Sequence, residues 1–173
     1  MKKLLSFLIP LLFFGKVFSQ TDTAGKAQQI DSTEFTDTSK TYIVEINKLL
    51  YTAQANLGTP YRYAGKKPGG FDCSGFVMYC FSNALGVQLS PAATYYYKHG
   101  VQVSKENARP GDVICFTGSN AAYKSIGHVG IISEVTPTDI YFIHSALNGG
   151  VRYDSLSLGY YKLRFLQIRR ILN

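Results

Sequence analysis

Three residues of the chain combine a candidate nucleophile with two candidate bases, and the nucleophile is Cys73. It follows Asp72 at the point where a loop rich in glycine and proline gives way to a helical pattern. We therefore expect Cys73 at a helix N-terminus with Asp72 as the N-cap. Free backbone N–H groups and the helix dipole stabilise a thiolate there, which predicts a lowered thiol pKa, and they can also hold an oxyanion. Because unreactive buried cysteines are common, position alone leaves both interpretations open.

Two histidines supply the candidate bases. His128 lies at the start of one predicted strand and His144 at the end of the next. A base and an orienting partner on adjacent strands, facing a cysteine on a helix, repeat the logic of a catalytic triad. His128 would take the thiol proton and His144 would hold the His128 ring. The third histidine, His99, is expected to be an ordinary core or surface residue.

The register of the two strands sets a condition on this triad. A two-residue turn at positions 137–138 pairs Ile131 with His144, and side-chain alternation then puts His128 on the opposite face from His144. The triad requires a pairing centred nearer Thr136, a β-bulge, or a His128 that precedes the regular strand. Imidazoles on opposite faces would contradict it.

Apolar spacing predicts helices first and strands afterwards. Helical spacing over residues 42–56 and 73–85 predicts two helices, the second ended by Gly86, and a short third helix is expected within residues 88–100. Alternating and β-branched runs predict strands at 113–116, 129–135, 140–144, 151–153 and 163–171. Helices followed by a strand meander are typical of an α+β domain rather than a parallel α/β fold.

The N-terminus has the pattern of an export signal. Two lysines precede an apolar run over residues 4–14, and residues 17–19 offer a cleavage site before Gln20. The run is short for a membrane span. We therefore predict a signal peptide at 1–19, a disordered polar spacer at 20–41 and the catalytic domain at 42–173. This predicts an exported protein, periplasmic or extracellular, with no stable membrane span after cleavage.

Composition narrows the class of function. The chain has 173 residues, enough for one domain, and a formal net charge of +7 without a run of Lys and Arg that would mark a nucleic-acid site. Cys80 and Cys115 fall in apolar segments and are expected to be inert, and the sequence leaves open whether they pair. No cluster has the spacing of a zinc site, and a thiolate–imidazole pair needs no metal or cofactor.

Five segments, in one order, resemble the NlpC/P60 family of cell-wall cysteine peptidases. They are residues 57–65 (LGTPYRYAG), 71–77 (FDCSGFV), 109–113 (RPGDV), 127–131 (GHVGI) and His144. The resemblance implies a papain-like α+β fold, with N-terminal helices packed on an antiparallel sheet, and a triad of Cys73, His128 and His144. It also implies that the substrate-binding residues are Tyr61, near the oxyanion site, Asp72 and Ser74.

The activity implied by the resemblance is hydrolysis of peptide bonds in peptidoglycan stem peptides, often between γ-D-glutamate and the diamino acid. Many members have Pro-Arg-Thr/Ser followed by Gln after the cysteine helix, whereas residues 90–95 here keep only the proline. Because of that departure, the sequence does not determine which peptide bond is cut. Two alternatives remain: an N-acetylmuramoyl-L-alanine amidase or acyltransferase of related fold, and a non-catalytic wall-binding domain.

Overall fold

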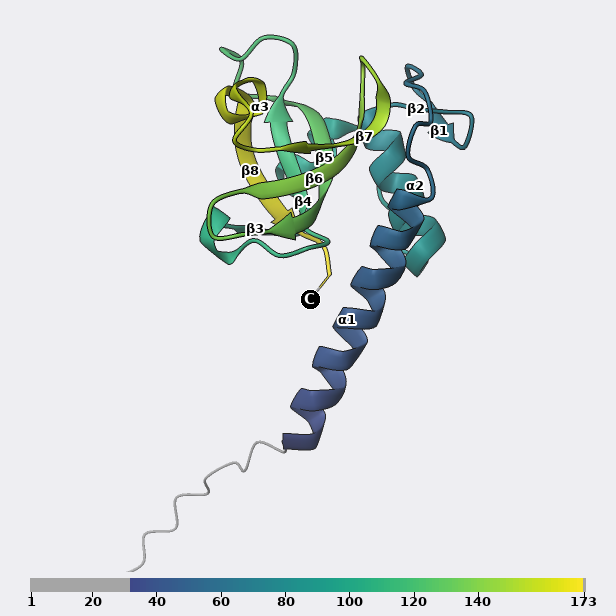
Figure 1. The fold of residues 1–173 in the computed structure, drawn as a ribbon, viewed down its shortest axis with the longest axis vertical. Helices are drawn as coiled ribbons and strands as arrows, with labels where there is room; N and C mark the ends of the chain where they lie inside the picture. Colours follow the sequence, from purple (N-terminus) through teal and green to yellow (C-terminus); the bar gives the residue numbers. More distant parts are fainter. Residues whose placement is uncertain (1–31, 173) are drawn as a thin grey trace, which may run out of the picture. The chain divides into compact units, whose positions relative to one another are not determined.

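The computed structural model describes residues 32–172, which form an α+β domain (Figure 1). The predicted signal peptide and the first part of the predicted spacer lie outside the described residues. Helix α1 spans Ser32–Gln54, so positions 32–41, which we expected to be disordered, are helical. Among residues 38–54 of α1, Ile46 is the first whose side chain is buried. Apolar periodicity therefore predicted the part of α1 that packs on the domain and missed the helical turns at positions 32–41.

Helix α2 spans Cys73–Leu85, as expected, because both of its ends carry local stop signals. The Asp72 side chain accepts a hydrogen bond from the N–H of Gly75 at 2.6 Å, which confirms the predicted N-cap. Gly86 closes the other end in the left-handed region with φ 70°. Gly75 also allows a close approach, since a Cβ there would overlap the carbonyl oxygen of Gly65. The loop before α2 is thus held against its first turn.

The main sheet has six antiparallel strands in the order β3-β8-β4-β5-β6-β7. Their bounds are Val101–Val103 (β3), Val113–Thr117 (β4), Ile126–Val135 (β5), Ile140–Ala146 (β6), Gly150–Ser155 (β7) and Phe165–Arg170 (β8). The meander from β4 to β7 follows the prediction. The single strand expected over 163–171 is instead the end of helix α3, Gly159–Arg164, followed by β8.

Shorter elements complete the domain. A two-stranded ribbon, β1 (Lys66–Lys67) with β2 (Gly70–Phe71), precedes α2. The tyrosine-rich segment forms a 3-10 helix, η1 (Ala93–Tyr97), and a second one, η2 (Lys105–Asn107), follows β3. The short helix expected within residues 88–100 is therefore present.

The sheet is covered on both faces. On one face, α1 and α2 pack on strand residues such as Val113, Val129 and Ile131, and Figure 1 shows these two helices on the same side of the sheet. On the other face, Phe116 and Phe142 cluster with Tyr161 of α3. Central strands covered on both faces are expected to be apolar almost throughout, and every residue of β4 is buried.

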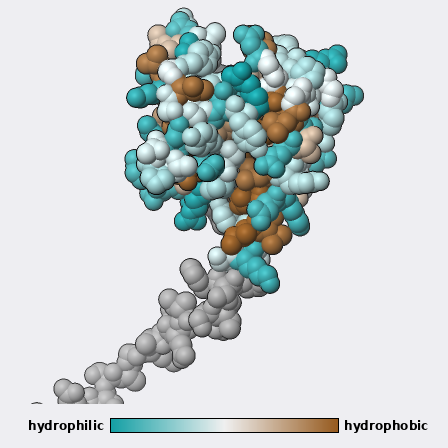
Figure 2. All heavy atoms as spheres, in the orientation of Figure 1, coloured by the Kyte–Doolittle hydropathy of each residue, from teal (hydrophilic) through white to brown (hydrophobic). Residues whose placement is uncertain are grey.

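Apolar side chains also reach the surface of the domain. Ile43 and Val44 of α1 are 56% and 44% exposed, and Figure 2 shows apolar atoms gathered in the lower part of this face. No helix among residues 32–172 is long and apolar enough to cross a bilayer.

Candidate active site

A β-bulge in β5 brings the two histidines to the same face of the sheet. The register between β5 and β6 shifts between residues 132 and 134, so Ser133 is an extra residue. Ile131 therefore pairs with Ile143 rather than with His144. Because Ile131 and Ile143 face α2, alternation directs His128 and His144 to the opposite face. The condition that the sequence set for the triad is met by the bulge.

Gly130 keeps the space beside His144 free. A Cβ added at Gly130 would lie 3.0 Å from the Cβ of His144 and 3.0 Å from Cδ2 of Phe142. Any larger side chain would push the buried imidazole away from its position. The glycine of the segment 127–131 is therefore explained by the need to seat His144.

The two imidazoles are in direct contact. Nε2 of His128 lies 2.7 Å from Nδ1 of His144, and the ring planes are nearly perpendicular at 85°. His144 is fully buried and His128 is half-buried. His144 thus contacts the His128 ring from a buried position, and its role in orienting that ring stays a prediction.

Asp154 extends this contact, and no local pattern in the sequence singles it out. Nε2 of His144 lies 2.9 Å from Oδ2 of Asp154. The strands β6 and β7 pair His144 with Arg152, so Asp154, two residues further along β7, lies on the same face. The turn signal Asn148-Gly149-Gly150 could have set this register in advance, because Ala146 pairs with Gly150 across it.

Cys73 lies beside the start of β5, the strand that carries His128. Its Sγ lies 4.0 Å from the carbonyl oxygen of Gly127, the residue before His128. Cys73, His128 and Tyr61 line one cavity of about 240 Å³. The N-terminus of α2 therefore places the thiol in the same cavity that His128 lines.

The pKa of the Cys73 thiol is raised by burial, whereas we expected it to be lowered. Desolvation raises the pKa of Cys73, although hydrogen bonds from the backbone N–H groups of Val129, Ser74 and Cys73 itself act to lower it. The amides at the helix terminus compensate only part of the cost of removing a thiolate from water. The prediction of a lowered pKa is therefore wrong.

The pKa of the candidate base moves in the opposite direction. Burial, with a smaller contribution from His144, lowers the pKa of His128 to about 3, while Asp154 acts to raise it. At neutral pH the resting pair is therefore a neutral thiol and a neutral imidazole. Such a pair suits general-base chemistry, in which the proton leaves the thiol as sulfur attacks.

Of the three predicted substrate-binding residues, only Tyr61 lines this cavity. Burial raises the pKa of Tyr61, and the charge of Asp72, with that of Cys73 when its thiol ionises, raises it further, so the phenol remains a hydrogen-bond donor. Oδ1 of Asp72 caps α2 and lies 3.0 Å from the hydroxyl of Ser74. That hydroxyl also lies 3.0 Å from the carbonyl oxygen of Pro91. Asp72 and Ser74 therefore support the first turn of α2, and their roles in substrate binding stay predictions.

The other cysteines lie away from this chemistry. Cys80 and Cys115 are free thiols that are fully buried. Burial raises the pKa of both, that of Cys115 to about 12. Both thiols are thus protonated at neutral pH and shielded from solvent.

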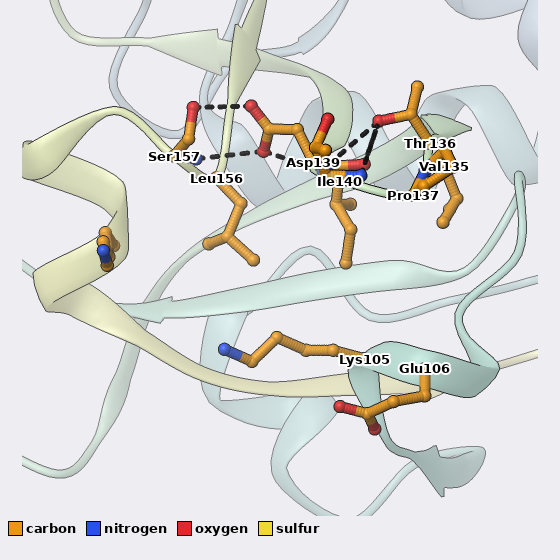
Figure 3. A pocket seen from close by; sticks show the side chains of 11 residues that line it. Lys105, Glu106, Val135, Thr136, Pro137, Asp139, Ile140, Leu156 and Ser157 are labelled. Atoms are coloured by element: carbon orange, nitrogen blue, oxygen red, sulfur yellow. Dashed lines mark hydrogen bonds between the residues drawn. The ribbon is translucent and has the colours of Figure 1, made fainter.

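A second hollow, of about 480 Å³, is lined by residues such as Lys105 and Asp139 (Figure 3). Its lining contains neither cysteine nor histidine, and the Asp139 carboxylate is held by the N–H and hydroxyl of Ser157. It offers neither a thiol nucleophile nor an imidazole base. Within residues 32–172, no three His, Cys, Asp or Glu side chains are grouped to hold a metal ion.

Comparison with known families gives a match over most of the described domain. Residues 58–170 match the model of the NlpC/P60 family. The chain belongs to the NlpC/P60 family. A solved NlpC/P60 family protein from Bacillus cereus superposes with a TM-score of 0.66 and 29% identity, over 74% of this chain and 40% of that one. The NlpC/P60 assignment and the papain-like α+β fold expected from the sequence are therefore confirmed.

Two curated NlpC/P60 relatives carry named activities. The chain is 37% identical over 122 residues to gamma-DL-glutamyl hydrolase of Bacillus subtilis. This match covers 70% of this chain but only 28% of that protein. It is 37% identical over 115 residues to the probable endopeptidase NlpC of Escherichia coli, covering 66% of this chain and 70% of that protein. The chain thus spans less than a third of the first relative and about two thirds of the second.

Proposed function

We propose that the protein is a cysteine endopeptidase that hydrolyses peptide bonds in peptidoglycan stem peptides. Cys73 is the nucleophile, His128 the general base and His144 the residue that orients His128. The main support for this proposal is that Cys73 and His128 line one cavity, while Nε2 of His128 lies 2.7 Å from Nδ1 of His144. The names of the relatives, an endopeptidase and a gamma-DL-glutamyl hydrolase, support this chemistry.

The proposed reaction begins from the neutral pair. As Sγ of Cys73 attacks the scissile carbonyl carbon, its proton passes to His128. The tetrahedral oxyanion is held by the free N–H groups of the first turn of α2 and by the phenol of Tyr61. The imidazolium then protonates the departing amine, and the acyl group remains on Cys73 as a thioester. Water, deprotonated by His128, hydrolyses the thioester and restores the thiol.

We propose that the bond cut joins γ-D-glutamate to the diamino acid. The name of the Bacillus subtilis relative supports a γ-glutamyl substrate. Arg164 lines the same cavity, with its guanidinium 3.8 Å from the centroid of the Tyr160 ring. A cation there would attract the free carboxylates that stem peptides carry.

The proposal also places the protein outside the cytoplasm, where peptidoglycan lies. The signal peptide predicted at residues 1–19 would direct this export. The partner is the wall itself or its stem peptides, and no nucleic acid takes part.

Digestion of purified peptidoglycan by the protein from Gln20 onward tests the proposal, with products identified by mass spectrometry. We expect a new free amine on the diamino acid, and we expect it to be lost in Cys73→Ala. Cys80→Ala is the matched control, because Cys80 is fully buried and lies outside the cavity. A separated lactyl-peptide would instead indicate an amidase. No cleavage of wall or of free stem peptides by the unaltered protein would overturn the proposal.

A further inference from the structure

We infer that Asp154 is a positioning residue that fixes the tautomers of both imidazoles and thereby keeps Nδ1 of His128 free of a proton. The inference deepens the proposed function, since it assumes that His128 is the base. It makes a fourth residue, on a third strand, responsible for the protonation state of a ring that it does not touch.

The direction of each hydrogen bond follows from the carboxylate. An ionised carboxylate only accepts hydrogen bonds, so Nε2 of His144, 2.9 Å from Oδ2 of Asp154, must donate. A neutral His144 then has a bare Nδ1, which must accept. The atom 2.7 Å from it, Nε2 of His128, must therefore carry a proton. In a neutral His128 this leaves Nδ1 bare, and it is the remaining ring nitrogen for the thiol of Cys73.

Asp154 is held in the ionised form by donors that converge on one oxygen. Besides His144, Oδ2 accepts from Nε of Arg152 at 2.8 Å and from the hydroxyl of Tyr161 at 2.9 Å. Burial opposes ionisation, but these three donors together lower the pKa of Asp154 to about 2. The Asp154 side chain is 9% exposed. The Asp154 carboxylate, at the end of this series of hydrogen bonds, is therefore charged over the whole pH range in which the protein would work.

Helix α3 covers this network. Tyr161 is 6% exposed and its ring lies edge-on to the His144 ring, with centroids 5.4 Å apart. Its hydroxyl lies 3.4 Å from Nε2 of His144 and closer to Asp154. Without the carboxylate, the two imidazoles could exchange donor and acceptor roles, and the reversed arrangement puts a proton on Nδ1 of His128. That arrangement cannot accept a proton from Cys73.

Steady-state kinetics of Asp154→Ala on a γ-D-glutamyl stem peptide give the first test. We expect kcat to fall roughly a hundredfold with KM within about twofold, because general-base catalysis contributes on the order of 10²–10⁴ in rate. Asp139→Ala is the matched control: Asp139 stands at the other end of β6, bonded to Ser157 rather than to the histidines. Its kcat should stay within about twofold. Equal kcat in Asp154→Ala and the unaltered protein would overturn the inference.

Nitrogen-15 NMR of the imidazoles gives a readout that does not depend on the substrate. In the unaltered protein, Nε2 of both His128 and His144 should carry the proton. In Asp154→Ala, protonated Nδ1 of His128 should appear, and it should stay absent in Asp139→Ala. Unchanged imidazole signals in Asp154→Ala would overturn the inference. If the unaltered protein cuts no wall peptide, the proposed function fails, while these spectra still decide the role of Asp154.

Asp154→Asn guards against misfolding of the alanine variant. Its amide oxygen can take the place of Oδ2 and satisfy the same three donors without the charge. We expect the kcat of Asp154→Asn to be about tenfold higher than that of Asp154→Ala. We also expect Nδ1 of His128 to stay unprotonated in the asparagine variant. An asparagine variant that folds and keeps the imidazole protonation unchanged, yet has a kcat as low as that of Asp154→Ala, would overturn the inference.

Discussion

At the scale of single residues, burial decides the charge of the groups that would react. Cys73 stands at a helix N-terminus, yet it is only 8% exposed and its pKa is raised. The same burial lowers the pKa of His128. A thiolate–imidazolium pair would need both shifts reversed. The resting Cys73–His128 pair is therefore uncharged, and charge would develop only as the sulfur attacks the substrate.

Alkylation by iodoacetamide should report this charge state. We expect Cys73 to be modified ahead of Cys80 and Cys115, because it lines the cavity while the other two are fully buried. Since the thiol pKa is raised above its ordinary value of 9.0, the thiolate fraction is small at neutral pH. Labelling should therefore rise about tenfold per pH unit from pH 7 and level off only above pH 9.

Mass spectrometry of the modified peptides measures these rates for each cysteine. A Cys73 rate that is fast and independent of pH between 5 and 8 would instead indicate a thiolate–imidazolium pair. Equal, slow labelling of all three cysteines would count against a reactive nucleophile.

At the scale of the elements, one inserted residue and one glycine bring the site together. The bulge at Ser133 turns His128 to the face that carries His144. Gly130 leaves room for the Cβ of His144 and the ring of Phe142. Both features lie in β5, so this strand decides the geometry of the base.

Gly130→Ala should damage both stability and activity. The added Cβ would meet Cβ of His144 and Cδ2 of Phe142 at 3.0 Å, which is tighter than ordinary packing. We expect a loss of about 1–3 kcal/mol in the free energy of unfolding, measured by urea titration, and a lower kcat because His144 is displaced.

Gly159→Ala serves as the control for this prediction. No atom lies within 4 Å of a Cβ at Gly159, the first residue of α3. We expect its stability to change by less than about 1 kcal/mol and its kcat to stay unchanged. Wild-type stability and kcat in Gly130→Ala would show that His144 does not depend on this glycine.

At the scale of the whole molecule, the turn of residues 109–112 ties distant elements together. Oδ2 of Asp112 accepts from the backbone N–H of Arg109 and from the guanidinium of Arg170 in β8, both at 2.8 Å. Gly111 has φ 91°, and a Cβ there would overlap the Ile46 side chain of α1. The RPGD segment thus joins α1 to β4 and β8, which explains its residues by packing rather than by catalysis.

Asp112→Ala should destabilise the fold without altering the chemistry. The ion pair with Arg170 is buried, with side chains 2% and 15% exposed. Removal of one partner leaves the other charge uncompensated, so we expect a loss of about 3 kcal/mol in the free energy of unfolding. The kcat of the folded fraction should stay within about twofold.

A double variant separates the pair from the loss of packing. In Asp112→Ala with Arg170→Met, no buried charge remains unpaired, so part of the lost stability should return. Urea titration of the two single variants and the double variant measures this coupling. Strictly additive losses would mean that the ion pair contributes nothing of its own.

Local signals in the sequence were enough for the family, the fold class, α2 with its cap, and the strands from β4 to β7. They also singled out Cys73, His128 and His144, because helix caps, glycine turns and apolar periods act over a few neighbouring residues. The predicted triad and the domain bounds stay predictions.

Tertiary structure alone decided the bulge at Ser133 and the charge of Cys73, and it brought Asp154, whose strand the turn at 148–150 only aligns with β6, into contact with His144. A strand slips by one residue according to what its faces must bury, and two strands must pair before Asp154 can meet His144. A pKa depends on which elements cover the group, whatever its neighbours in the chain. These properties depend on contacts between residues far apart in sequence, which local patterns do not record.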